Sequence, residues 1–112
     1  MRQAWLVLAL GAGEGADARP TAVEVRTFQF RDATIEVPIG TEVVWSNRDA
    51  IEHTVTSGAP DSTNGVFAGR MAHSGATFSH VFDRLGTFGY FCDRHHFMRG
   101  QVRVVPLTHG ES

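Results

Sequence analysis

Positions 90 to 98 of the chain read Tyr90-Phe91-Cys92-Asp93-Arg94-His95-His96-Phe97-Met98. A thiol, an imidazole and a thioether follow one another there at Cys-x2-His-x2-Met spacing. The aromatic residues 86–91 are typical of a strand, and residues 101–105 alternate as a second strand after a turn at Arg99-Gly100. The sequence therefore predicts that the three donor side chains lie on a short loop held at both ends by a sheet.

Sulfur and nitrogen donors of this kind suit copper, especially where the metal must be stable in both oxidation states. Three donors from one loop need a fourth from elsewhere, and His53 is the candidate because it opens the β-branched segment 53–57. Two histidines, one cysteine and a weak axial methionine are the donor set of a blue-copper electron-transfer site. Zinc is a poorer match, because it prefers four firm ligands and a thioether is a weak fourth.

Each donor also has a plainer interpretation when it is considered alone. Cys92 is the single cysteine of the chain, so no intramolecular disulfide is possible, and a lone buried cysteine is often inert. His53 alone would be read as a surface histidine, and Met98 alone as a core residue. The combined spacing favours the metal site. Three further histidines lack partners at ligand spacing and are predicted to be solvated: His73, His80 and His109.

The composition predicts one small all-β domain. The chain has 112 residues and a formal charge of −2, and it carries no basic stripe, which argues against nucleic acid as a partner. Twelve glycines and no long helical period favour a Greek-key β-sandwich of about eight short strands. The predicted strands are 21–30, 35–37, 42–47, 53–57, 66–70, 76–82, 86–91 and 101–105, with a loop at 57–65. The predicted aromatic core is Trp45, Phe78, Phe82, Phe88 and Tyr90.

The first eighteen residues are predicted to be an export signal peptide. Arg2 supplies a charged start, residues 4–10 are apolar, and Ala16-Asp17-Ala18 matches a small-x-small cleavage site. The apolar segment is far too short to span a bilayer. A disordered or core-packed N-terminus is the alternative. The sandwich domain would occupy residues 19–107, and residues 108–112 would form a C-terminal tail.

Two segments of the chain resemble those of cupredoxins, the type 1 blue copper proteins, and most of all amicyanin. Residues 45–53 are similar to the segment around the first histidine ligand, and residues 86–102 to the ligand loop with its two-residue gap before methionine. The resemblance covers roughly residues 23–105. It implies one copper ion per chain, and it selects His95 over its neighbour His96. The ligands implied are His53, Cys92, His95 and Met98.

The residues around these ligands decide how the site is tuned. Amicyanin has prolines where this sequence has Glu52, Arg94 and His96, and a histidine where it has Phe91. Outer contacts tune a metal as its ligands do, so these departures bear on the redox potential and on the choice of partner.

Two residues near His53 are predicted to support the site. Asn47 lies at a strand end, where its side chain can hydrogen-bond nearby backbone and fix the loop geometry. The resemblance places the backbone N–H of Thr54 as a donor to the Cys92 sulfur. Such a bond would withdraw charge from the sulfur and raise the redox potential.

These features predict a soluble periplasmic monomer that carries single electrons and is not an enzyme. The resemblance implies a c-type cytochrome or a periplasmic dehydrogenase as partner, with His95 as the electron exit and His96 and Phe97 in a docking patch. The alternative is a copper-binding or delivery protein with the same ligands, although methionine occurs at positions 1, 71 and 98 rather than in clusters. A copper enzyme would need a second metal site, which one domain without a His-Cys-His triplet cannot build.

Overall fold

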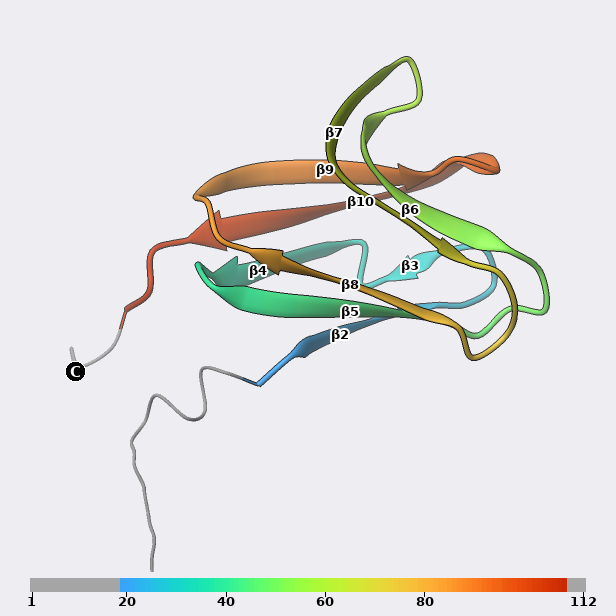
Figure 1. The fold of residues 1–112 in the computed structure, drawn as a ribbon, viewed down its shortest axis with the longest axis horizontal. Coiled ribbons are helices and arrows are strands. Elements are labelled where there is room, and N and C mark those ends of the chain that lie inside the picture. The colour runs from blue at the N-terminus through green and yellow to red at the C-terminus, as the bar shows by residue number, and fades with distance from the viewer. Residues whose placement is uncertain (1–18, 109–112) are drawn as a thin grey trace, which may run out of the picture.

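The computed structural model describes residues 19–108, which form two β-sheets packed face to face (Figure 1). The strands are β2 (Thr21–Val25), β3 (Phe30–Arg31), β4 (Thr34–Pro38), β5 (Thr41–Asn47), β6 (His53–Ala59), β7 (Ser62–Met71), β8 (Thr77–Phe82), β9 (Gly86–Cys92) and β10 (His95–Val105). One sheet has the order β4-β10-β9-β6-β7 and the other β3-β2-β5-β8. The predicted all-β sandwich is confirmed. Within the described residues, no helix is long and apolar enough to cross a membrane.

The pairing of β6 with β9 brings the two ligand segments together. These strands run antiparallel, with Thr56 opposite Phe91 and Ser57 opposite Tyr90. The start of β6 therefore lies beside the end of β9, and these are the positions of His53 and Cys92. Strand β10 returns along the other edge of β9, so His95 pairs with Cys92 itself. Residues far apart in the sequence thus meet at one end of the sandwich.

Three of the predicted segment boundaries were wrong. The segment 21–30 is two strands, because Arg26 and Gln29 exchange backbone hydrogen bonds and reverse the chain. The predicted loop 57–65 is mostly strand, since β6 and β7 form a long hairpin that rises above the sheets in Figure 1. The predicted turn at Arg99-Gly100 lies inside β10 and pairs with β9. The ligand loop is correspondingly short, with two residues between β9 and β10.

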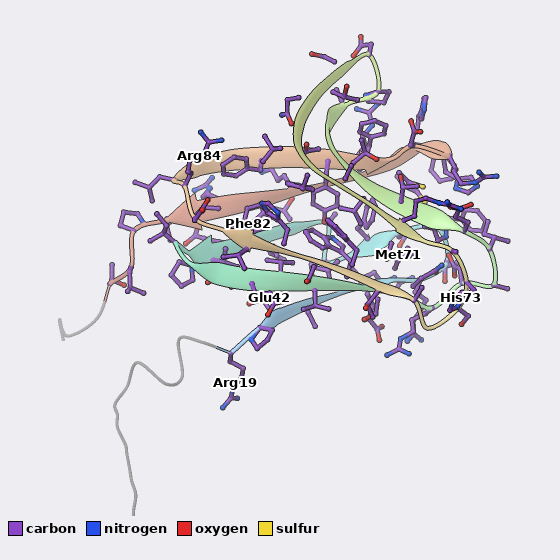
Figure 2. The ribbon with its side chains drawn as sticks, in the orientation of Figure 1. Arg19, Glu42, Met71, His73, Phe82 and Arg84 are labelled. Atoms are coloured by element: carbon purple, nitrogen blue, oxygen red, sulfur yellow. The ribbon has the colours of Figure 1, made fainter. Side chains whose placement is uncertain are left out.

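The core is an aromatic cluster centred on Trp45. Alternate residues of β5 are buried, which places Trp45 between the sheets with no exposed surface. Its ring packs against aromatic rings from β7, β8 and β9: Phe67, Phe78, Phe82 and Tyr90. Figure 2 shows Phe82 and Met71 among the side chains of the interior, whereas Arg84 and Arg19 point away from it. The predicted aromatic core is confirmed, with Phe88 packed at its margin.

His80 is half-buried rather than solvated, so that prediction was wrong. Its ring lies 4.8 Å from the ring centroids of both Phe67 and Phe82. Burial lowers the pKa of His80 below its ordinary value, and the nearby carboxylate of Asp83 only partly opposes this effect. Alternation along β8 places His80 on the same face as Phe82, but its contact with Phe67 of the other sheet has no local pattern in the sequence. His73 is exposed as predicted, and His109 lies outside the described residues.

The packing of His80 predicts a pH-dependent stability. Its pKa is lower in the folded protein than in the unfolded chain, so the unfolded state binds more protons as the pH falls. The contribution of His80 to the free energy of unfolding should therefore be complete above the ordinary histidine pKa. The free energy of unfolding should decrease as the pH falls below that value. Guanidinium unfolding of the copper-loaded protein between about pH 5.5 and 8 measures this slope. The slope should be smaller in His80→Gln and unchanged in His73→Gln; equal slopes in all three proteins would contradict the prediction.

The tight contact between β9 and β10 predicts a large difference between two neighbouring glycines. A Cβ at Gly100 would lie 2.4 Å from the hydroxyl oxygen of Tyr90, whose side chain is buried. A Cβ at Gly89 would meet nothing closer than 4.0 Å. We expect Gly100→Ala to lower the free energy of unfolding by about 1–3 kcal/mol, because a buried ring must move. Gly89→Ala, measured by the same denaturant titration, is the control, and a comparable loss there would exclude the steric explanation.

Candidate metal centre

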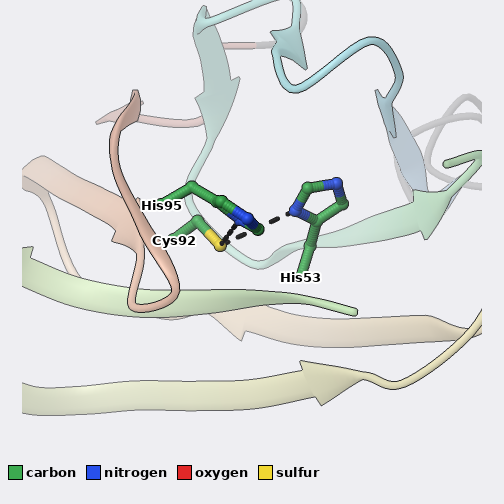
Figure 3. A group of neighbouring side chains, drawn as sticks. All are labelled: His53, Cys92 and His95. Atoms are coloured by element: carbon green, nitrogen blue, oxygen red, sulfur yellow. Dashed lines mark hydrogen bonds between the residues drawn. The ribbon is translucent and has the colours of Figure 1, made fainter. Parts of the chain in front are cut away.

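Three donor side chains converge at the end of the sandwich where β6, β9 and β10 meet (Figure 3). The Cys92 sulfur lies 3.7 Å from Nδ1 of His53 and 3.6 Å from Nδ1 of His95. All three donor atoms lie within 4.8 Å of one another. His53 and Cys92 have no exposed surface, and His95 is half-buried. The structure thus brings together three of the four residues that the sequence singled out as ligands, in one small volume.

Met98 occupies a buried position on the same hairpin. Its side chain is 2% exposed and belongs to the apolar cluster that contains Cys92. The register between β9 and β10 shifts between His95 and Arg99, so the intervening residues do not pair with β9. This irregularity turns Met98 inward while its neighbour Phe97 is 70% exposed.

The carboxylate of Asp49 sets the orientation of His53. Its Oδ2 lies 2.8 Å from Nε2 of His53. An N–H at Nε2 that donates to this oxygen leaves Nδ1 as the nitrogen with a free lone pair, and Nδ1 is the atom that faces the Cys92 sulfur. A histidine held by a carboxylate in this way is a common arrangement behind metal ligands.

Asp49 also holds the chain segment that covers the site. Its two oxygens accept hydrogen bonds from the backbone N–H groups of Thr27 and Phe28, at 2.7 and 2.9 Å. Both residues have positive φ angles, 55° and 59°, which side chains rarely adopt without support. Burial acts to raise the pKa of Asp49, but the N–H of Phe28, the His53 ring and the N–H of Thr27 together hold it below its ordinary value. The carboxylate is therefore ionised over the whole neutral range.

Phe28 packs edge-on against both imidazoles. Its ring centroid lies 5.3 Å from that of His53 and 5.0 Å from that of His95, and it stacks on Phe97 at 6.4 Å. Partial burial lowers the pKa of His95, the neighbouring His53 ring and the Arg94 guanidinium act in the same direction, and the carboxylate of Asp49 only partly opposes them. His95 is accordingly neutral at pH 7 and available as a donor.

Thr54 makes two contacts that support the Cys92 position. Its backbone N–H donates to the Cys92 sulfur at 3.3 Å. Its hydroxyl oxygen accepts the N–H of Asp93 at 2.7 Å and lies 3.1 Å from the hydroxyl of Thr56. The first contact reduces the negative charge on a thiolate, and the second fixes the turn that follows Cys92.

Asn47 holds the loop that carries Asp49 and His53. Its buried amide donates to the carbonyl oxygens of Ile51 and Met71, at 2.8 and 3.1 Å, and its oxygen accepts the N–H of Asp49 at 2.9 Å. Every polar atom of the Asn47 side chain is thus used to shape the loop between β5 and β6.

Glu52 links the two ligand segments from outside. Its carboxylate pairs with Arg70 of β7 and, at 3.5 Å, with Arg94 in the turn before His95. Two of the positions at which the sequence departs from amicyanin, Glu52 and Arg94, are therefore partners of one another. The third, His96, is exposed, as predicted, and lies 3.8 Å from Asp93.

Two residues of this site, Asp49 and Phe28, were not predicted from the sequence. Asp49 precedes His53 by four residues, but this spacing has no special meaning in a loop. Phe28 belongs to a segment that was predicted to be strand. The contact between Asp49 and the backbone of Thr27 and Phe28 offers no local pattern, because it depends on the turn between β2 and β3 lying against the loop between β5 and β6.

The residues present fit one type 1 copper site. A thiol, two imidazoles with Nδ1 facing the sulfur, and a buried thioether nearby form the soft and intermediate donor set that copper prefers in both oxidation states. Burial of the sulfur and its single N–H donor also match a ligand that must remain a thiolate without reacting.

Comparisons with known proteins give the same result. A family model described as copper binding proteins, plastocyanin/azurin family, matches residues 18–105. Amicyanin-alpha from Methylorubrum extorquens is 32% identical over 96 residues, which are 86% of this chain and 81% of that protein. Amicyanin from Paracoccus denitrificans is 32% identical over 93 residues, covering 83% and 70% of the two chains. A solved structure of a reduced amicyanin mutant superimposes with a TM-score of 0.69 at 29% identity, covering 77% of this chain and 82% of that one.

The role assigned to Asp49 predicts a specific loss of metal affinity. Asp49→Asn keeps the shape of the side chain but removes the charge that holds the N–H of His53, so Nδ1 becomes a weaker and less well-oriented donor. We expect Cu(I) affinity to fall by about 10–100-fold, the range seen when such outer partners are removed. Competition with a Cu(I) chelator measures it. The control is Asp93→Asn, an exposed acid beside the site, and an equal loss there would show that net charge rather than orientation is responsible.

Proposed function

Since the chain belongs to the plastocyanin/azurin family of copper-binding proteins, we propose that it is a blue copper protein that carries single electrons between redox partners. The observation that supports this function most directly is the convergence of two Nδ1 atoms on the buried Cys92 sulfur. Copper, when bound, supplies the chemistry by alternating between its two oxidation states.

Each residue of the centre has a separate part in the proposed function. Cys92, His53 and His95 would hold the metal, and the thioether of Met98 would be a weak further ligand that tunes its potential. The N–H of Thr54 draws charge from the sulfur. Because these side chains lie on or next to paired strands, β6, β9 and β10, we expect little rearrangement to accompany a change of oxidation state.

The electron leaves through His95, the least buried of the three clustered donors. Two exposed apolar side chains pack against its ring, Phe28 and Phe97, which are 37% and 70% exposed, and Ile51, 41% exposed, lies in the loop before β6. With His96 they form what we call the apolar docking face. Such a face allows a partner to approach closely and to separate quickly, which suits a carrier.

The cell compartment and partners are part of the proposal. We propose an exported, periplasmic monomer whose partners are a c-type cytochrome or a periplasmic dehydrogenase, and the similarity of the chain to amicyanins supports this proposal. The proposed signal peptide, residues 1–18, and most of the proposed C-terminal tail lie outside the described residues. We propose no enzymatic role, because a copper enzyme would need a second metal site.

The absorption spectrum after Cu(II) addition tests this function. The wild-type protein should show an intense blue thiolate-to-copper band that a mild reductant bleaches reversibly. The band should be absent in Cys92→Ala and strongly altered in His95→Gln, but unchanged in the neighbouring variant His96→Gln. A colourless protein that binds only Cu(I) would instead support copper delivery, and preference for zinc would refute both functions.

A further inference from the structure

We propose that Phe28 is a positioning residue of the copper centre, whose ring holds the imidazole of His95 in the ligand position. This inference rests on the proposed carrier function, because it takes His95 as a ligand and as the exit for the electron. Phe28 lies in the turn between β2 and β3, whereas His53 and His95 begin β6 and β10 of the other sheet. One side chain from the opposite sheet thus contacts both imidazoles of the centre.

His95 is the least restrained of the three clustered donors. His53 and Cys92 have no exposed surface, and the carboxylate of Asp49 lies 2.8 Å from the outer nitrogen of the His53 ring. His95 is half-buried, and the hydrogen bonds within residues 19–108 include none to its Nε2. The orientation of the His95 ring therefore depends on the side chains that pack against it.

Three rings pack against His95, and Phe28 is the nearest of them. The distances between ring centroids are 5.0 Å to Phe28, 5.1 Å to His53 and 6.2 Å to Phe97. Phe97 lies on the same strand as His95 and is 70% exposed, so it moves with the ligand hairpin. Phe28 is an independent support, because it comes from the other sheet. Its edge-on contact, at an interplanar angle of 84°, is a favourable one for aromatic rings and restricts rotation of the imidazole.

The turn that carries Phe28 has an unfavourable backbone conformation. Thr27 and Phe28 both have positive φ angles, which are rare for a β-branched or a bulky residue. Such conformations persist where the surrounding structure imposes them, and they cluster at functional sites. Asp49 imposes this one, because its two oxygens accept the backbone N–H groups of both residues. The strained turn is thereby fixed with the Phe28 ring against the imidazoles.

One carboxylate therefore positions both histidines. Oδ2 of Asp49 lies 2.8 Å from Nε2 of His53 and accepts the N–H of Phe28 at 2.9 Å. Asp49 orients His53 directly, and it orients His95 through the ring of Phe28. Because Phe28 belongs to the apolar docking face, this support lies where a partner would touch the protein.

Competition by free imidazole tests the proposal on the Cu(II)-loaded protein. Imidazole that replaces His95 changes the thiolate-to-copper absorption, so a titration followed in the visible spectrum measures how readily His95 gives up its position. We expect Phe28→Ala to change at an imidazole concentration about tenfold lower than the wild-type protein does. Phe28→Tyr keeps the ring and should match the wild-type protein. Phe28→Leu, which keeps an apolar side chain on the turn, is the second variant if Phe28→Ala does not fold, and it should show a smaller shift in the same direction.

Ile51→Ala is the matched control. Ile51 belongs to the apolar docking face and is 41% exposed, but it is not one of the rings that pack against His95. This variant should titrate like the wild-type protein. Equal shifts in Ile51→Ala and Phe28→Ala would show that apolar cover rather than the ring contact is responsible, and they would overturn the proposal. Unchanged titrations of Phe28→Ala and Phe28→Leu would overturn it as well.

Nuclear magnetic resonance of the metal-free protein gives a second test that does not depend on copper. The wild-type protein should show nuclear Overhauser contacts between the ring protons of Phe28 and His95. The His95 ring signals should broaden through exchange in Phe28→Ala but not in Ile51→Ala. Absence of the ring contacts in the wild-type protein would refute the positioning role. A protein that shows these contacts but gives no blue band would refute the carrier function alone, so the two failures are distinguishable.

Discussion

The hydrogen bond from the Thr54 N–H to the Cys92 sulfur is the contact on which the arrangement of this protein depends. It joins residues 38 positions apart, and it exists only in one register of β6 against β9. A shift of one residue would turn every side chain of β6 to the opposite face, which would remove His53 from the metal centre and Val55 from the core. The metal centre and the hydrophobic core therefore require the same register.

A second layer of constraint comes from neutral and charged hydrogen bonds that lie behind the donors. Asn47 shapes the loop before β6, and Asp49 on that loop holds both the His53 ring and the turn that carries Phe28. Because the bonds of Asn47 and the contact between Asp49 and His53 are buried or partly buried, losing one partner would leave the other without a hydrogen bond, at a cost of about 1–3 kcal/mol. These bonds therefore keep Nδ1 of His53 directed at the Cys92 sulfur.

The sequence predicted the parts of this arrangement that leave a local pattern. Cys92, His95 and Met98 have fixed spacing on one hairpin, and alternation identified most strands, so the fold and the donor set were accessible. Asp49 and Phe28 lie on two turns that touch only in the folded chain. Their contact therefore has no characteristic spacing in the sequence. The turn at 26–29 was missed for the same reason: its positive φ angles are supported by a carboxylate twenty-one residues or more away.

The long β6–β7 hairpin was missed because its residues favour turns. Glycine, proline, serine and asparagine dominate positions 57–65, yet Ser57 and Asn64 bond across the hairpin at 2.6 Å and Ser57 accepts the N–H of Phe67. Side-chain hydrogen bonds thus support pairing that local propensity opposes.

The buried polar groups hold the metal ligands in place, whereas the exposed ion pairs do not. Exposed ion pairs contribute little to stability, with typical values of about 0–1 kcal/mol, so the Glu52 cluster is not required to hold the centre together. Buried contacts of Thr54, Asn47 and Asp49 already do so. Contacts that a partner makes with such exposed groups would therefore leave the donors undisturbed, which suits a carrier that must bind and release two partners around one unchanged metal site.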